Sequence, residues 1–260
     1  MKTSLSVITV VAIIGLSVSV EAESQINSWI PSGSLSLSLQ ERYIGIRSSR
    51  VLYDGPSFWS ELVVNLPKGL YLNIWDHQGI AGDPASKQPN ELDLTFGWRG
   101  KVPLWGLEAG FSTTYLNNSP VGLWFEGDVW SQAATLSKTY RLGNHTLKPQ
   151  LRVEWFSRAN DVGGGVYLLM PNVSHTWEQP FGIKPLCLAE QAFIIHDDGF
   201  KPAKNDSESY FLRWNAGLRW RLSKSVALTL PSFSAQIPLH SGNDGRGQAT
   251  SWGTSLVFSF

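Results

Sequence analysis

The sequence predicts an all-β protein, a closed antiparallel transmembrane β-barrel of about 12 strands. Three observations support this prediction. The N-terminus has the pattern of an export signal, apolar and polar residues alternate with a period of two through most of the chain, and the last segment is an alternating strand that ends in phenylalanine. Period-two alternation places successive side chains on opposite faces of a strand. We expect an exported chain of such strands in the bacterial outer membrane.

Residues 1–22 have the composition of a secretory signal peptide. Lys2 gives a short positive region, residues 8–20 form a mostly apolar run, and Val20-Glu21-Ala22 offers a small-x-small cleavage site. We expect cleavage after Ala22, which leaves 23–260 as the outer-membrane barrel domain. A retained anchor is the alternative, although the apolar run is short for a span of about 20 residues.

The bulk composition argues against several partners and sites. The formal net charge is zero, whereas a nucleic-acid partner requires a basic surface, so we expect no nucleic acid. Cys187 is the single cysteine, so no intramolecular disulfide is expected. The 12 tryptophans suit membrane–water interfaces, where the ring is half buried in lipid and its N–H stays hydrated.

Candidate strands follow one another with few interruptions, and their connections alternate in length. Short turns such as Pro67-Lys68 alternate with longer polar loops such as 48–56. Outer-membrane barrels have this arrangement, with short periplasmic turns and long external loops. The candidate strands are 34–47, 57–66, 69–78, 90–101, 104–116, 121–138, 146–158, 164–178, 183–197, 209–223, 226–239 and 248–260. Proline lacks a ladder donor, so the boundaries stay open at Pro149, Pro171, Pro185 and Pro231.

The two faces of the strands differ in character. In a barrel the apolar face meets lipid and the polar face lines the lumen. A soluble exported β-sandwich has the same alternation and remains an alternative. The bulky residues assigned to the outer face are Leu92, Leu94, Phe96, Trp98, Leu151, Val153, Trp155, Leu212, Trp214, Leu218 and Trp220. Aromatic residues expected to form interfacial girdles are Trp75, Trp98, Tyr115, Trp155 and Trp220.

The C-terminal strand carries an expected sorting signal. Trp252, Leu256, Phe258 and Phe260 alternate with small residues and valine, and phenylalanine is the last residue. A final strand of this kind resembles the recognition signal of bacterial outer-membrane barrels. We therefore expect the barrel-assembly machinery and outer-membrane lipid to be partners of the chain.

Three segments resemble a known family. They are Tyr43-Ile-Gly-Ile-Arg-Ser48, Gly69-Leu-Tyr-Leu-Asn-Ile-Trp-Asp76 and Glu91-Leu-Asp-Leu-Thr-Phe-Gly-Trp98. These segments are similar to the first strands of the small TorF-like (Gcw_chp) porin family. The resemblance covers about the first half of the chain and has no catalytic motif. It implies a porin-like protein of the outer membrane and names no solute.

Charged residues on the inward phase suggest a function. The N-terminal half of the wall collects mostly acidic residues and the C-terminal half mostly basic ones, so the two halves are expected to face each other. A transverse field between them would orient and filter small polar or charged solutes. The alternative is that these charges pair and plug the lumen. The predicted pore-lining residues are Glu61, Asp93, Arg99, Glu108, Glu126, Asp128, Arg152, Glu154, Arg213, Arg219 and Arg221.

Catalytic, metal and cofactor sites are not expected. A lipid-modifying barrel enzyme would need a serine and a histidine that meet on one face, but Ser174-His175 and His240-Ser241 are sequence neighbours that point to opposite faces. No two histidines have metal-ligand spacing. The sequence therefore predicts a channel for passive diffusion and no enzyme. A non-conducting barrel that acts through its external loops is the first alternative, and an outer-membrane lipid-modifying enzyme is the second.

Overall fold

A computed structural model of the chain describes residues 31–45, 51–80, 90–103, 105–117, 129–158, 166–197, 209–239 and 248–260. The predicted signal peptide lies outside these residues. The predicted pore-lining residues Glu126 and Asp128 also lie outside them.

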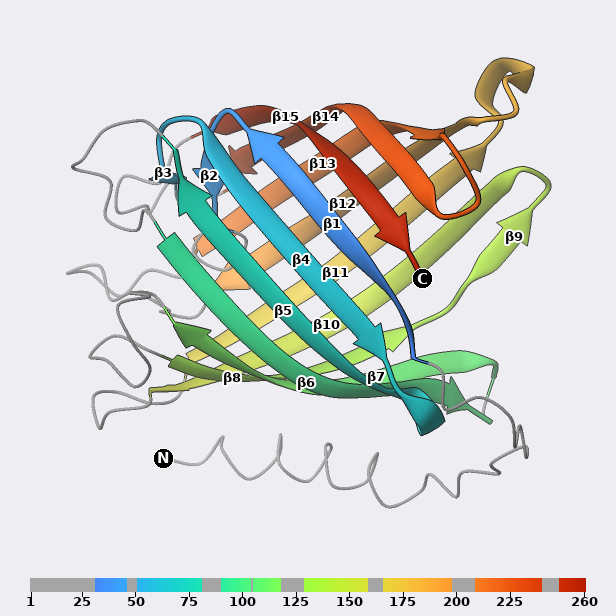
Figure 1. Cartoon of the computed structure of the whole chain (residues 1–260). Coiled ribbons are helices and arrows are strands. Elements are labelled where there is room, and N and C mark those ends of the chain that lie inside the picture. The colour runs from blue at the N-terminus through green and yellow to red at the C-terminus, as the bar shows by residue number, and fades with distance from the viewer. Residues whose placement is uncertain are drawn as a thin grey trace.

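Twelve antiparallel strands form one closed wall, because β10 pairs with both β8 and β11 and β1 pairs with both β4 and β15. The predicted closed barrel is thereby confirmed (Figure 1). The wall strands are β1 (Ser32–Gln40), β4 (Ser57–Asn65), β5 (Leu70–Gly79), β6 (Asn90–Val102), β7 (Leu107–Asn117), β8 (Val129–Ser137), β10 (His145–Arg158), β11 (Val166–Glu178), β12 (Leu186–Asp197), β13 (Ser209–Arg221), β14 (Val226–Pro238) and β15 (Ala249–Ser259). A short strand, β9 (Tyr140–Leu142), pairs with the start of β10.

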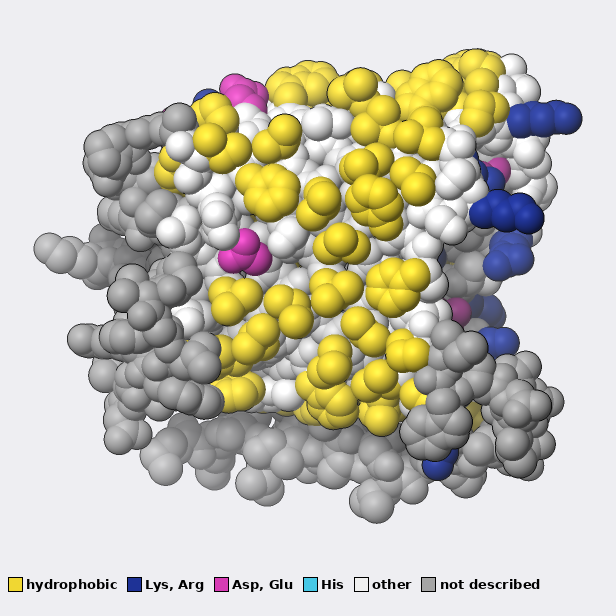
Figure 2. All heavy atoms as spheres, viewed as in Figure 1, with side chains coloured by type: hydrophobic (Ala, Val, Ile, Leu, Met, Phe, Trp, Pro, Cys, Tyr) yellow, Lys and Arg dark blue, Asp and Glu magenta, His cyan; other side chains and the backbone are white. Residues whose placement is uncertain are grey.

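The phase of the alternation is continuous from strand to strand. Leu35 lies opposite Phe258 on β15 and opposite Leu62 on β4, so all three side chains share one face of the wall. Figure 2 shows that hydrophobic side chains cover the outer surface of the barrel on the side seen there. The residues that the alternation assigns to the outer face occupy it throughout. An outward apolar band of this kind is the surface that a lipid bilayer covers.

The connections at one end of the barrel, here called the turn end, are tight. The 3-10 turn η1 (Pro67–Gly69) joins β4 to β5, and η2 (Pro180–Gly182) precedes β12. Gly69 has φ +80°, and a Cβ there would lie 2.1 Å from the carbonyl oxygen of Arg99, so only glycine fits. β1 starts and β15 ends at the turn end (Figure 1). The opposite end is called the loop end.

The structure corrects the predicted first strand. Residues 34–47 do not form one wall strand, because the wall strand ends at Gln40 and the chain then turns away. β2 (Tyr43–Ile44) and β3 (Val51–Tyr53) form a separate two-stranded sheet, here called the inner hairpin. Three polar residues, Gln40-Glu41-Arg42, interrupt the apolar alternation, and Tyr43 and Ile44 beyond them pack inside the barrel instead of against lipid.

Two smaller predictions are resolved by the strand registers. Trp75 was expected in the outer girdle, but it lies opposite Glu61 and Asp93 on the inward face, so that assignment is wrong. Pro149 and Pro171 lie within wall strands, opposite Val173 and Leu151 respectively.

Candidate functional site: the lumen

The inner face of the wall is polar over most of its turn-end half. Serine, threonine, asparagine and glutamine alternate there with charged residues, and most of these side chains are partly exposed. In β1, for example, Ser34, Ser36 and Ser38 point inward while the leucines between them point outward. A partly exposed polar wall requires water or polar solute beside it, because an apolar filling would leave its hydrogen-bonding groups unsatisfied.

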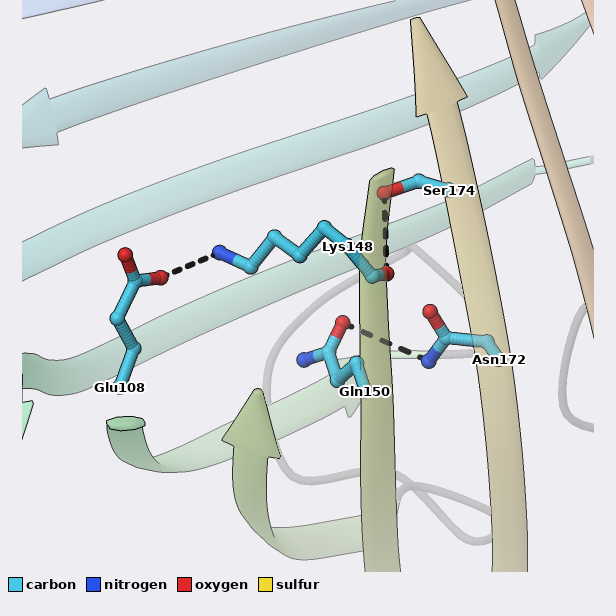
Figure 3. Close-up of polar contacts among 5 residues, drawn as sticks. All are labelled: Glu108, Lys148, Gln150, Asn172 and Ser174. Carbon is cyan, nitrogen blue, oxygen red and sulfur yellow. Dashed lines mark hydrogen bonds and ion pairs between the residues drawn. The ribbon is translucent and has the colours of Figure 1, made fainter. Parts of the chain in front are cut away.

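One belt of polar contacts crosses β7, β10 and β11 (Figure 3). Lys148 Nζ lies 2.6 Å from Glu108 Oε2 and forms an ion pair between β10 and β7. Asn172 Nδ2 donates to Gln150 Oε1 at 3.5 Å, and Ser174 Oγ donates to the Lys148 carbonyl oxygen at 3.5 Å. The side chains of Lys148 and Glu108 are 36% and 39% exposed, so this ion pair stays in contact with solvent.

Other inward charges are held by near neighbours in the wall. Arg152 Nη2 lies 2.9 Å from Glu154 Oε2 on the same strand, and Arg221 Nη2 lies 2.5 Å from Glu178 Oε2. On the far side of the lumen, Asn73 Nδ2 donates to Glu61 Oε1 at 2.7 Å. These contacts fix the positions of the charged groups, as expected for a lumen that presents a set pattern of charge.

The water-accessible inward charge is positive among the wall-strand side chains whose exposure the structure describes. The accessible charged side chains are basic at Arg99, Lys101, Lys148, Arg152, Arg219 and Arg221 and acidic at Glu61, Glu108 and Glu178. Six basic minus three acidic groups give a net charge of +3. Lysine and arginine side chains gather at the turn end of the barrel (Figure 2).

The inner hairpin crosses the lumen nearer the loop end. Tyr43 Oη donates to Glu91 Oε2 on β6 at 2.7 Å, and Arg213 Nη1 on β13 donates to the carbonyl oxygen of Ile44 at 2.9 Å. β6 and β13 are six strands apart in either direction around the twelve-strand wall, so they lie opposite each other. Adjacent hairpin residues are therefore bonded to opposite walls. Ser251 Oγ on β15 adds a third contact, to the Arg42 carbonyl oxygen at 2.8 Å.

Aromatic packing holds the same hairpin against β5. The Tyr43 ring lies 4.2 Å from the His77 ring and 5.5 Å from the Trp75 ring, measured between centroids. Tyr53 lies over Gly79, where an added Cβ would be 2.4 Å from the tyrosine ring. Gly79 is required here because the tyrosine ring occupies the space of a side chain. The hairpin is thus packed tightly into the wall that surrounds it.

An apolar cluster packs the inward face near the loop end on the other side of the barrel. Its members come from β7, β8, β10, β11 and β13, and the core side chains are 5% exposed or less. They are Leu116, Phe156, Leu168, Met170 and Phe211, with Val129 packed against them. The described lumen therefore has two levels, a polar, water-accessible vestibule at the turn end and a packed constriction nearer the loop end.

The predicted pore-lining residues divide between these two levels. Asp93, Glu154 and Arg213 are buried, with 7%, 1% and 7% exposure. The partly or fully exposed group consists of Glu61, Arg99, Glu108, Arg152, Arg219 and Arg221. All nine occupy inward register positions. Arg99 and Glu154 are the exceptions to the predicted opposition of acidic and basic walls, and Glu154 pairs with Arg152 on one strand.

Sequence reasoning missed the residues that shape the lumen most. Lys148 is in phase with Arg152 on the same strand, so extending that alternation past Pro149 would have found it. Glu178 is likewise in phase with Ser174. Tyr43 had no such signal, because its role follows from the chain folding back into the barrel.

The remaining predicted site features have clear positions. Trp252, Leu256 and Phe258 of the expected sorting signal point outward from β15, and the Phe260 backbone bonds to Gly33. Ser174 points inward and His175 outward, as expected for sequence neighbours on a strand. Among the described residues, no helix has the length and apolar character to cross a membrane. In the same part of the chain, no group of three His, Cys, Asp or Glu side chains could hold a metal ion.

No known protein family and no curated protein sequence matches the chain. Solved structures are similar to it over most of its length. An outer membrane channel from Pseudomonas putida F1 covers 93% of this chain and all of its own at 12% identity, with a TM-score of 0.54. The KdgM porin covers 88% of this chain and 99% of its own at 9% identity, and the NanC porin covers 87% and 100% at 11% identity, both with TM-scores of 0.52.

At these identities the likeness shows the fold alone, which is that of outer-membrane channel and porin barrels. The outer-membrane barrel implied by the resemblance to the TorF-like porins is confirmed as a fold. Membership of that particular family stays a prediction.

Proposed function

We propose that the protein is an outer-membrane channel for small polar solutes, with a preference for anions, and that the inner hairpin constricts it from the external side. The observation that supports this proposal is the polar vestibule with its accessible net charge of +3. A low-dielectric wall focuses the field of such charges into the lumen and concentrates counter-ions there. The occurrence of this fold among channels and porins supports the proposal.

The orientation follows from the lengths of the connections. Short turns of outer-membrane barrels face the periplasm and long loops face outward. The vestibule therefore opens to the periplasm, and the hairpin lies toward the external mouth. No catalytic residue takes part, since selectivity in such a channel comes from charge and width. Displacement of the hairpin would widen this constriction.

Ion selectivity of single channels in planar bilayers tests the proposal. Arg99 and Arg219 are both exposed on the inward face, so the double variant Arg99→Glu/Arg219→Glu changes the accessible charge from +3 to −1. The wild type should favour anions, and this variant should favour cations. The matched control Arg99→Lys/Arg219→Lys keeps the charge and should keep the anion preference.

The hairpin also supports a second candidate function, a non-conducting barrel that binds partners through its external loops. In that case the contacts of the inner hairpin with β5, β6, β13 and β15 would be permanent. A folded, inserted wild type that never conducts, together with a hairpin-displaced variant that never conducts, would favour this function and reject the channel.

A further inference from the structure

A polar cluster lies on the outer face of the barrel, where the wall should meet lipid. His175 Nδ1 on β11 lies 3.0 Å from Glu190 Oε2 on β12, and His175 Nε2 lies 3.0 Å from His145 Nδ1 on β10. All three residues occupy outward register positions. Among the described wall strands, Asp76 and Glu190 are the outward carboxylates, so this cluster is an exception on an apolar surface.

The cluster lies near the turn end of the barrel. Glu190 is the fifth residue of β12, which starts at Leu186. Four residues of a strand tilted by about 45° rise roughly 9 Å along the barrel axis, which places Glu190 near the membrane interface. Trp177 stacks on the His145 ring at 5.3 Å with an interplanar angle of 22°, as expected for an interfacial aromatic residue. A lipid headgroup lies at this depth.

For neutral imidazole rings, the Glu190 carboxylate sets the direction of the hydrogen bonds. A carboxylate only accepts, so Glu190 accepts from the Nδ1–H of His175. With both rings neutral, His175 Nε2 then accepts from the Nδ1–H of His145, and the Nε2 of His145 is an acceptor. The negative charge of Glu190 polarises this chain in a low-dielectric setting. The exposed end of the chain at His145 therefore attracts a group that donates hydrogen bonds, such as a primary ammonium.

A shallow apolar groove adjoins the cluster on the side of the loop end. It has a volume of about 610 Å³ and is lined mainly by Leu136, Leu151, Pro171, Val173, Ala192 and Ile194. Val173 is two residues from His175 on the same face of β11, so the groove and the cluster are continuous. Lys138 lines the groove on its turn-end side, with Nζ 5.4 Å from the centroid of the Tyr140 ring. Lys138 therefore supplies a cation at the edge of the groove that faces the cluster.

We propose that this face binds one glycerophospholipid with a primary-amine headgroup from the periplasmic leaflet. The headgroup ammonium donates to His145, the phosphodiester pairs with Lys138, and an acyl chain lies in the groove. The Lys138 ammonium complements the phosphate charge, the His145 nitrogen accepts from the headgroup ammonium, and the groove fits an acyl chain. The inference rests on the proposed outer-membrane placement of the barrel and does not require that the lumen conducts.

Native mass spectrometry of the detergent-solubilised protein tests the inference by titration with three lipids of the same acyl chains. Phosphatidylethanolamine carries a primary ammonium, phosphatidylcholine has no N–H donor, and phosphatidylglycerol has no amine. The wild type should retain one phosphatidylethanolamine at least tenfold more tightly than the other two. His145→Ala and the isosteric Glu190→Gln should each reduce this preference at least fivefold. The matched control Asp76→Asn, which alters the other outward carboxylate, should leave the preference unchanged.

Folding of each variant is checked by heat-modifiable mobility on gels, and Glu190→Gln keeps the test valid where His145→Ala does not fold. Equal retention of the three lipids by the wild type would overturn the inference, as would an unchanged preference in Glu190→Gln. A clear lipid preference in a barrel that never conducts would reject the proposed channel while supporting the lipid site. Conduction without any lipid preference would support the channel and reject the lipid site.

Discussion

The contact between Gly79 and Tyr53 allows the hairpin to be displaced by a single substitution. A Cβ at Gly79 would lie 2.4 Å from the Tyr53 ring, whereas ordinary carbon contacts are about 3.5–4.0 Å. In Gly79→Val, either the tyrosine ring or the whole hairpin must therefore move by roughly 1.1–1.6 Å. Tyr53 is only 6% exposed, so the hairpin has little room to accommodate the shift in place.

The size of the effect follows from the cost of overpacking. Inserting extra methyl groups into a packed region costs about 1–3 kcal/mol. If this energy opposes only the inserted position of the hairpin, the ratio of open to closed barrels rises roughly 5- to 150-fold. Single-channel recording in planar bilayers measures this ratio directly as the open probability. Gly79→Val should therefore open far more often than the wild type at the same voltage and salt.

The wall itself supplies a matched control. A Cβ at Gly97 would also lie 2.4 Å from a tyrosine ring, but that ring belongs to Tyr71 on the neighbouring wall strand. Gly97→Val makes the same kind of overlap without touching the hairpin. It should lower stability and leave the open probability close to that of the wild type. Equal open probabilities in Gly79→Val and the wild type would refute the gating role, and so would equal increases in both variants.

Three further predictions test the hairpin, the two faces and the turns. Tyr43→Phe removes a hydrogen bond to a carboxylate, worth about 1.5–3 kcal/mol, and should raise the open probability at least about tenfold in the same recordings, whereas Tyr71→Phe should not. Ile74→Arg places a charge on the lipid face near the middle of β5 and should cost about 2–4 kcal/mol in urea unfolding from vesicles, while Asn73→Arg, one residue away and beside Glu61, should cost under about 1 kcal/mol. Gly69→Ala should destabilise the barrel by about 1–3 kcal/mol in the same assay, because its backbone has φ +80° and its Cβ would meet the Arg99 carbonyl oxygen; a loss below about 0.5 kcal/mol would contradict the assigned turn.

The sequence predicted the wall well because a closed barrel repeats one simple pattern. Each strand has an apolar face and a polar face, and a shift of one residue would expose the wrong face to lipid along the whole strand. The outer positions of Leu94, Phe96 and Trp98 follow from this rule without any tertiary information. The alternation of short and long connections likewise followed from turn residues such as Pro67 and Lys68.

The contents of the lumen could not be predicted in the same way. The polar run Gln40-Glu41-Arg42 interrupts the alternation of β1, but nothing in the sequence shows that Tyr43 and Ile44 fold back into the lumen. Trp75 has the residue type of an interfacial girdle, yet its phase, opposite to that of Ile74, turns it inward, where it packs on Tyr43. Pairing of Arg213 with the Ile44 carbonyl joins residues 169 positions apart in the chain. Local pattern carries no information about such a contact.

The buried arginine explains why the hairpin is a stable part of the fold, and it would also lower the cost of the release that the proposed channel requires. Arg213 donates to a backbone carbonyl of the hairpin and, through Nε, to Ser234 Oγ at 3.2 Å. Its charge is costly in a packed region unless such acceptors are present. If the hairpin leaves, Arg213 loses one acceptor but gains water from the vestibule, and water replaces most of the lost hydrogen-bond energy. The difference in free energy between the inserted and released hairpin would therefore be small compared with the sum of its contacts. A constriction that opens under a modest applied force or voltage requires such a small difference.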